Sequence, residues 1–566
     1  MSMNMQSLGD LVGFGGHRAI VGERKWSSGG WRKQNLASPC KDSHVSVSLQ
    51  KNTVHLEADY YPNRIEKLKQ GVRKALFDSQ DLILIDTLQR LGISYHFEEE
   101  INQLLYQSYV TKYDDDGLFH TALRFRLLRQ SGYNVTQDVF QKFMNKEGKL
   151  KEDIKKDLFG LLSLHEASYT GTRGEEMLSQ AMMLSKQQLH KLQSVLKPTI
   201  ARDLDFALEF PRQRRMERYE AKSYIEKYDN VHIKNPDLFE LATLDFNAVQ
   251  RQYQREIGEL QSWWRDLGLA KKLSFARDRP LECFLWTVGM FPEPCFSICR
   301  VGVAKVVAIL LVIDDIYDIQ GSPEELDRFT DAIRRWNSDA IEELPEYMKV
   351  GYMAVYNTTN EIGFKILTEH GLYVVPHLRK TWLDLCEAFL LEAKWFRNET
   401  MPTLEDYINN GVTTAGTYMA LVHAFFLMGK QITKESLDAV SSCPELFTSS
   451  GRILRLWDDL GTAKAEEERG DDASSINCYR NDNIGSSEDD ARNHVKLLID
   501  NAWQDVNRES VAKTPLPHSI IKASVNMART AQAMYQHGDN RKSPSIDDCI
   551  QYLLNKPIHI FENTDN

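Results

Sequence analysis

The 566-residue sequence has few cysteines, no long apolar segment and no excess of basic residues. Its eight cysteines form no paired framework, which argues against a disulfide scaffold and fits thiols in a reducing compartment. The most apolar run, residues 306–313, ends at two aspartates and is far shorter than the ~20 residues that a membrane span needs. With 69 basic against 80 acidic residues, the chain lacks the positive charge of a general nucleic-acid binder. We therefore expect neither a membrane span nor a nucleic-acid partner.

The alternation of period two that is typical of β-strands is also nearly absent. From Asn63 onward, apolar residues recur every three or four positions, which indicates amphipathic helices and an all-α fold. The pattern over 235–269 predicts one long helix that leads out of a first helical unit and into a second. We place the domains at 51–240 and 241–566, and we expect a monomer.

The first 50 residues differ in composition from the rest. They carry glycine clusters and many serines, their basic residues outnumber their acidic ones, and no apolar core of a secretory signal is visible. This composition favours a disordered leader of the organelle-transit type over a merely disordered tail.

Three carboxylates end the most apolar helical segment, in the string LLVIDDIYDIQG. They are Asp314, Asp315 and Asp318, and the spacing of four places Asp314 and Asp318 on one helical face. Buried charge is heavily penalised unless it is compensated, and hard oxygen ligands on one face suit Mg²⁺ or Mn²⁺. The alternative is a solvated helix end.

A second oxygen-bearing stripe follows in RILRLWDDLGTAKAEEERGD. Asp458, Thr462 and Glu466 are spaced four apart and therefore share one face of a helix. A hydroxyl between two carboxylates suits a hard cation, and Arg455 on a nearby face can hold an anion. The alternative, a charged exposed helix, explains the acidic run after residue 465 but not the string LRLWDD.

Upstream of both stripes, Arg277 and Arg279 flank an aspartate just ahead of a predicted helix. Guanidinium groups match phosphate oxygens, although a surface Arg–Asp pair is an equally simple interpretation. Together, two acidic faces, their cations and three arginines would bind a diphosphate and neutralise it as it leaves.

A departing diphosphate leaves a carbocation, which needs an apolar and aromatic cavity. Aromatic faces stabilise cations, and Trp286 is our first candidate for that role. Tyr317, Tyr418 and Tyr535 are further candidates, and for each of the four the alternative is an ordinary core aromatic.

The three strings resemble the motifs of plant terpene synthases. DDIYD at 314–318 is similar to the aspartate-rich motif, DDLGTAKAE at 458–466 to the second metal motif, and RDR at 277–279 to the upstream arginine motif. Their order and spacing agree with the family, from about residue 60 to the C-terminus.

This resemblance implies a class I terpenoid synthase fold over 241–566 that follows a non-catalytic, α-barrel-like domain. It implies three Mg²⁺ ions, with Mn²⁺ as a possible substitute, and a prenyl diphosphate substrate. The metal motifs would be Asp314, Asp315, Asp318, Asp458, Thr462 and Glu466, with Asp315 acting indirectly. By the same resemblance Asp314, Asp315 and Asp318 are catalytic candidates, to which we add Trp286 as the aromatic candidate chosen above, while Arg277, Arg279 and Arg455, with Asp314 and Asp318, would bind the substrate.

The subgroup can also be narrowed. The tandem arginines and tryptophan that are typical of cyclising monoterpene synthases are missing, since Arg24-Lys25 precedes Trp26. Longer strings, including LSFARDRPLECFLWTVG and NGVTTAGTYMALVH, are most similar to geraniol synthases, although Ile319 and Gln320 depart from their pattern. We therefore expect geranyl diphosphate to give geraniol in a plastid. Linalool, bornyl diphosphate, nerolidol from farnesyl diphosphate, a cytosolic location and a non-enzymatic helical scaffold are the alternatives.

Overall fold

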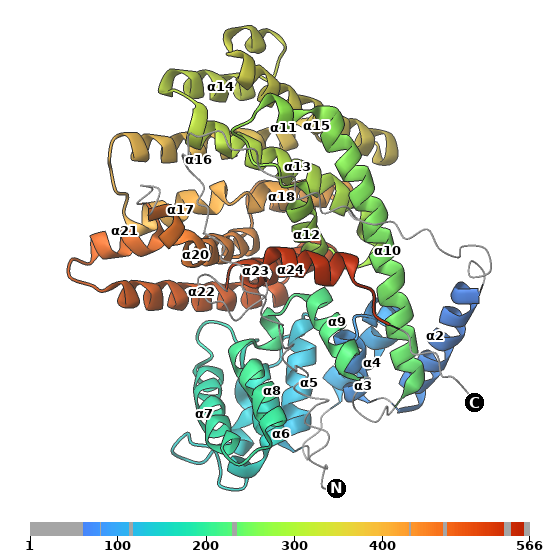
Figure 1. Cartoon of the computed structure of the whole chain (residues 1–566). Coiled ribbons are helices and arrows are strands. Elements are labelled where there is room, and N and C mark those ends of the chain that lie inside the picture. The colour runs from blue at the N-terminus through green and yellow to red at the C-terminus, as the bar shows by residue number, and fades with distance from the viewer. Residues whose placement is uncertain are drawn as a thin grey trace.

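The computed structural model describes residues 60–79, 81–111, 117–228, 235–429, 432–467, 473–536 and 545–559, without the side chains of 60–62, 228 and 464–467. The predicted leader at 1–50 lies outside these residues. Within them the structure contains no β-strand, only one isolated bridge between Met144 and Leu150, so the predicted all-α fold is confirmed (Figure 1).

The first helical unit, blue to green in Figure 1, packs around two apolar clusters. One cluster lies between α2, α3, α4, α5, α9 and the start of α10, and the other between α5, α6, α7 and α8. The helices are α2 (Tyr60–Ser79), α3 (Leu82–Arg90), α4 (Glu98–Val110), α5 (Leu118–Gln130), α6 (Leu158–Ser168), α7 (Glu176–Gln193), α8 (Pro198–Glu209) and α9 (Glu217–Tyr228), with short 3₁₀ turns η2 (Ser94–Phe97), η3 (Gln137–Phe143), η4 (Ile154–Lys156) and η5 (Arg212–Arg214).

A buried ion cluster ties the helices of this unit together. Asp86 on α3 accepts hydrogen bonds from Arg126 of α5 at 2.6 Å and from Arg212 of η5 at 2.6 and 2.9 Å. Burial alone would raise the pKa of Asp86, but the two guanidinium groups hold that pKa below its ordinary value. The charge is thus compensated, and the cluster fixes three segments that are distant in sequence.

The long helix α10 (Pro236–Leu267) joins the two units, as the sequence predicts. The Asn235 side chain caps its start by accepting hydrogen bonds from two backbone N–H groups, and Gly268 ends it in the left-handed conformation at φ 68°. Leu241 near its start packs in the first unit, whereas Ile257 packs in a cluster with α12 and the C-terminal helices. Because α10 runs continuously across residue 240, the exact domain boundary stays a prediction.

The second unit, green to red, surrounds the largest apolar cluster of the described residues. Its helices are α11 (Leu269–Lys272), α12 (Pro280–Met290), α13 (Ser297–Asp315), α14 (Pro323–Arg335), α15 (Glu346–His370), α16 (Val375–Arg397), α17 (Leu404–Thr414), α18 (Thr417–Met428), α19 (Lys434–Ser441), α20 (Glu445–Glu467), α21 (Ser475–Asp482), α22 (Glu488–Val511), α23 (His518–Tyr535) and α24 (Ile546–Ile550), with 3₁₀ turns η6 (Pro294–Phe296) and η8 (Asp339–Glu343) and π-turns η7 (Ile316–Gln320) and η9 (Gln551–Asn555).

Two helical stretches of this unit, Pro294–Gln320 and Leu404–Met428, are long and apolar enough to cross a membrane by length and composition. Most of each stretch is buried inside the protein, 67% and 78% of the apolar windows. Core helices of a globular protein meet the same criterion, so this finding is weak evidence for a span. Our expectation that the chain has none stays a prediction.

Candidate active site

A cavity of about 690 Å³ opens among the helices of the second unit. It is lined from α12, α13, α16, α17, α18, α20 and α23, so the site is assembled from segments spread over more than 250 residues of sequence. The metal-motif residues with described side chains, the three arginines and Trp286 all line it, namely Arg277, Arg279, Trp286, Asp314, Asp315, Asp318, Arg455, Asp458 and Thr462.

The first acidic wall is the end of α13. The helix is apolar and deeply buried until Asp314 and Asp315, after which the chain continues as the π-turn η7 and carries Asp318. The widened turn is closed by a hydrogen bond from the Gly321 N–H to the Ile316 carbonyl oxygen at 2.8 Å. The sequence predicts regular α-helical spacing here, and the structure differs by this one π-turn, a feature that is frequent at functional sites. Both Asp314 and Asp318 still line the cavity.

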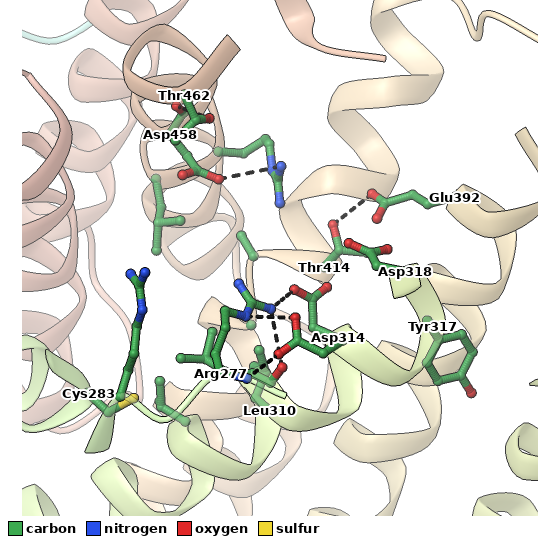
Figure 2. Close-up of a pocket in the computed structure, with 18 of the residues that line it drawn as sticks. Arg277, Cys283, Leu310, Asp314, Tyr317, Asp318, Glu392, Thr414, Asp458 and Thr462 are labelled. Carbon is green, nitrogen blue, oxygen red and sulfur yellow. Dashed lines mark hydrogen bonds and ion pairs between the residues drawn. The ribbon is translucent and has the colours of Figure 1, made fainter. Parts of the chain in front are cut away.

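Arg277 clamps this wall from the loop before α12. Its guanidinium pairs with Asp314 and lies 2.8 Å from the Asp315 carboxylate, whose other oxygen accepts a hydrogen bond from the Arg277 backbone N–H at 2.7 Å (Figure 2). Burial raises the pKa of Asp315 to about 6, against the opposing effect of Arg277. The Asp315 side chain is only 4% exposed, whereas that of Asp314 is 22% exposed. Asp315 therefore anchors the arginine while Asp314 faces the open space.

The second acidic wall lies on α20, across the cavity from the first (Figure 2). Asp458 and Thr462 line the cavity one turn apart, and the Thr462 hydroxyl donates to the Asp458 carbonyl oxygen at 2.8 Å. Because the hydroxyl proton is used within the helix, the lone pairs are what Thr462 can present to a cation. Glu466 lies in the last turn of α20, and its side chain is outside the described residues.

The second aspartate of this motif has a different environment from the first. Asp459 is fully buried, and it accepts hydrogen bonds from the Tyr407 hydroxyl at 2.9 Å and the Ser475 backbone N–H at 3.0 Å. In both acidic motifs, then, the first aspartate of the pair faces the cavity and the second binds protein groups.

Two further groups set the charge of Asp458. Arg455 places one guanidinium nitrogen 3.6 Å from a carboxylate oxygen of Asp458, and the same nitrogen 3.6 Å from one of Asp459. Burial raises the pKa of the Asp458 carboxyl above its ordinary value, whereas Arg455 and the neighbouring Tyr535 hydroxyl oppose that rise. Arg455 lines the cavity over α17, where a Cβ at Gly411 would come within 3.0 Å of its stem.

Below the charged rim the lining becomes apolar. Trp286 of α12 lines it, with its ring centroid 5.9 Å from that of Tyr535. Tyr317 borders the cavity too, but Figure 2 shows its ring turned away, and its hydroxyl is 2.7 Å from the Thr330 hydroxyl. Tyr418 is not among the lining residues, and its hydroxyl donates to the Val440 carbonyl oxygen. The remaining apolar lining includes Met290, Val307, Leu310, Leu311, Ala420, Leu454 and Met527.

A polar group that the sequence did not single out also lines the cavity. Glu392 of α16 accepts hydrogen bonds from the Thr414 hydroxyl at 2.8 Å and the Asn410 side-chain amide at 3.2 Å. Burial raises the pKa of Glu392 to about 7, although Arg455 opposes that shift. No local pattern marks Glu392, because its partners on α17 reach it only in the folded protein.

The donor set fits divalent cations that are shared with a substrate. Among the described residues, no three His, Cys, Asp or Glu side chains form a ready-made metal cluster. The cavity instead presents hard oxygens on two walls, from Asp314, Asp318, Asp458 and Thr462. Mg²⁺ typically takes one or two protein carboxylates together with substrate phosphate oxygens and water, so separated walls suit a metal–diphosphate complex.

Comparison with known proteins agrees with this site. The model of the terpene synthase family, metal binding domain, matches residues 265–505, and that of the terpene synthase N-terminal domain matches residues 40–208. A probable terpene synthase 11 of Ricinus communis is 52% identical over 92% of this chain and 91% of its own length. The chain belongs to the terpene synthase family.

Other relatives of this terpene synthase are named for particular products. A chloroplastic geraniol synthase of Ocimum basilicum is 46% identical over 90% of each chain, and relatives at 43% and 45% identity are named as R-linalool and trans-ocimene synthases. The solved isoprene synthase of grey poplar, in complex with three Mg²⁺ ions and a thiolodiphosphate, is 38% identical and superposes with a TM-score of 0.84 over 89% of this chain and 98% of its own. The chain is thus an enzyme of a family that uses divalent metals, with monoterpene synthases among its relatives.

Proposed function

We propose that the protein ionises geranyl diphosphate and adds water to the allylic cation, giving the acyclic alcohol geraniol. One observation carries the proposal: two oxygen-bearing walls face each other across the mouth of a cavity whose interior is apolar and aromatic. The mouth suits an anionic headgroup, and the interior suits a ten-carbon chain and a cation.

The chain's own residues divide the work of ionisation. Asp314, Asp318, Asp458, Thr462 and Glu466 would hold Mg²⁺, or Mn²⁺ in its place, and the bound cations supply Lewis-acid neutralisation of the leaving diphosphate. Arg277, Arg279 and Arg455 at the rim would contact its oxygens; Arg277 must then exchange part of its present pairing with Asp314.

The apolar part of the cavity would protect the cation after the carbon–oxygen bond breaks. Trp286 presents an aromatic ring there, backed by Tyr535, and the surrounding aliphatic side chains exclude bulk water. The similarity to a geraniol synthase and the missing arginine pair before Trp26 support an acyclic alcohol. Competing outcomes differ by only ~1–3 kcal/mol, so linalool, bornyl diphosphate, or nerolidol from farnesyl diphosphate are the alternatives.

The direct test is to incubate the protein with geranyl or farnesyl diphosphate in the presence of Mg²⁺, Mn²⁺ or EDTA and to identify the products. We expect geraniol as the main product from geranyl diphosphate with either metal, and no product with EDTA. A dominant cyclic product would refute the acyclic assignment, and activity in EDTA would refute the metal role.

Two rival functions are separated by further reactions. Chain-elongating prenyl transferases carry two DDxxD motifs, whereas Thr462 and Glu466 occupy the second motif here; longer diphosphates after addition of isopentenyl diphosphate would favour that rival. A helical scaffold protein would show no turnover, and Asp314→Ala would then change no measured activity. Several relatives are named chloroplastic, which supports a plastid location, with the cytosol as the alternative.

A further inference from the structure

We infer that Glu392 is a catalytic residue that binds the attacking water and accepts its proton. The inference rests on the proposed function and deepens it, because it assigns a residue to the step that separates an alcohol from a hydrocarbon. Two carboxylates in the lining belong to neither acidic motif, Glu282 and Glu392, and Glu282 is paired with Arg279 of the RDR string whereas Glu392 is held by a hydroxyl and an amide.

The two oxygens of Glu392 are in different situations. Oε1 accepts both the Thr414 hydroxyl and the Asn410 amide, and the second N–H of that amide donates to the Ala388 carbonyl oxygen at 3.1 Å. Within the described residues no group donates to Oε2. This atom is also not among the fully buried polar atoms, and its residue lines the cavity. The side chain is therefore held by one oxygen and presents the other to the cavity.

The position of Glu392 suits attack at the allylic end of the substrate. Its charge interacts with Asp314 on one wall and with Arg455 beside the other, so it lies within electrostatic range of both acidic walls. Figure 2 shows it on the same side of the cavity as Asp318 and Thr414. In the proposed complex, a headgroup held between the two walls would place C1 of the prenyl chain, the atom bonded to it, on the side of the cavity that Glu392 lines.

The proposed reaction involves only the substrate, one water molecule and Glu392. The C1–O bond of geranyl diphosphate breaks, and its electron pair leaves with the diphosphate. A lone pair of the water forms the new C1–O bond, one O–H bond breaks with its electrons remaining on oxygen, and the proton passes to Oε2 of Glu392. When no water is held there, the cation instead passes a proton from carbon to an oxygen of the released diphosphate, and the electrons of that C–H bond form the new double bond of an acyclic hydrocarbon.

The test compares Glu392→Gln with Glu387→Gln, a matched change of charge on the same helix. Glu387 is exposed and pairs with Arg334, outside the cavity. Two quantities are measured with geranyl diphosphate and Mg²⁺: diphosphate release, and the ratio of alcohol to hydrocarbon. A general base contributes ~10²–10⁴-fold, so we expect alcohol formation in Glu392→Gln to fall by at least about 100-fold while diphosphate release falls by less than tenfold. Glu387→Gln is expected to match the wild type.

Thr414→Val gives a second variant should Glu392→Gln fail to fold, as judged by its melting temperature. It removes one hydrogen bond to Oε1, and a loss of about fivefold in the alcohol share is expected. An unchanged alcohol share in the folded variant, or an equal loss of diphosphate release and alcohol, would overturn the role of Glu392. Wild-type protein that makes no alcohol would instead refute the proposed function, so the two failures are distinguishable.

Discussion

Replacing each aspartate of the Asp458-Asp459 pair should separate catalysis from folding. Asp459 is fully buried, and its carboxylate holds the Tyr407 hydroxyl and the Ser475 backbone N–H, with Arg455 at 3.6 Å. Asp458 lines the cavity with a side chain that is 19% exposed. We expect Asp459→Asn to unfold more easily, and Asp458→Asn to keep its stability but lose its activity.

The expected magnitudes follow from these contacts. A hydrogen bond to a charged group contributes ~1.5–3 kcal/mol, and breaking a buried ion pair costs ~3–5 kcal/mol. Asparagine keeps the shape and one acceptor of Asp459, so we expect a loss of about 3 kcal/mol for Asp459→Asn. In Asp458→Asn the lost pairing with Arg455 is offset, because the raised pKa means that burial already disfavours the charge.

Thermal unfolding with and without Mg²⁺ plus inorganic diphosphate distinguishes the two roles. At ~2–4 °C per kcal/mol, a loss of about 3 kcal/mol means that Asp459→Asn should melt about 6–12 °C below the wild type and still be stabilised by the ligands. Asp458→Asn should melt near the wild-type temperature, lose most of the ligand-induced shift, and turn over at least ~100-fold more slowly, since each ~1.4 kcal/mol of lost stabilisation is tenfold in rate. The reverse pattern, with Asp458→Asn unfolding and Asp459→Asn losing the ligand shift, would refute the assignment.

Three further predictions follow. Trp286→Ala should lower turnover more than Trp286→Phe, because phenylalanine keeps an aromatic face for the cation; equal losses in steady-state kinetics would show that Trp286 only fills space. Asp86→Asn should cost about 3–5 kcal/mol by breaking the buried pairs with Arg126 and Arg212, measured by thermal unfolding, and an unchanged melting temperature would contradict the buried cluster. Since the pKa of Asp315 is raised to about 6, protonation below that pH should remove one of the two carboxylate charges that hold Arg277 and lower turnover as the pH falls, whereas a pH profile that stays flat to pH 5 would argue against this coupling.

The sequence predicted those parts of the site that are local in the chain. The all-α fold, the joining helix α10 and all three charged motifs follow from spacing within single segments, and the described charged and hydroxyl side chains that the sequence assigned to the site line the cavity. The pairs Asp314-Asp315 and Asp458-Asp459 are visible in the sequence. Which member of each pair binds protein groups depends on neighbours that only the structure shows, because the backbone N–H groups of Arg277 and Ser475 come from other segments.

Other features depended on tertiary contacts that no single segment records. The residues that hydrogen-bond to Glu392 lie on α17, and the Tyr535 hydroxyl that interacts with Asp458 lies on α23. Composition could not sort the aromatic candidates either: Trp286 and Tyr535 line the cavity, Tyr317 points its hydroxyl at Thr330, and Tyr418 packs elsewhere. Aromatic residues look alike in sequence whether they face a core or a cavity, since both environments are apolar.

The central claim is that this cavity breaks a carbon–oxygen bond with the help of divalent cations. The decisive experiment is to incubate the protein with geranyl diphosphate in ¹⁸O-labelled water, with Mg²⁺ or with EDTA, and to measure the ¹⁸O content of the alcohol by mass spectrometry. We predict that the alcohol carries ¹⁸O and that EDTA abolishes its formation. An alcohol that retains the unlabelled oxygen of the substrate, as cleavage at phosphorus would give, or one that forms equally well in EDTA, would contradict it.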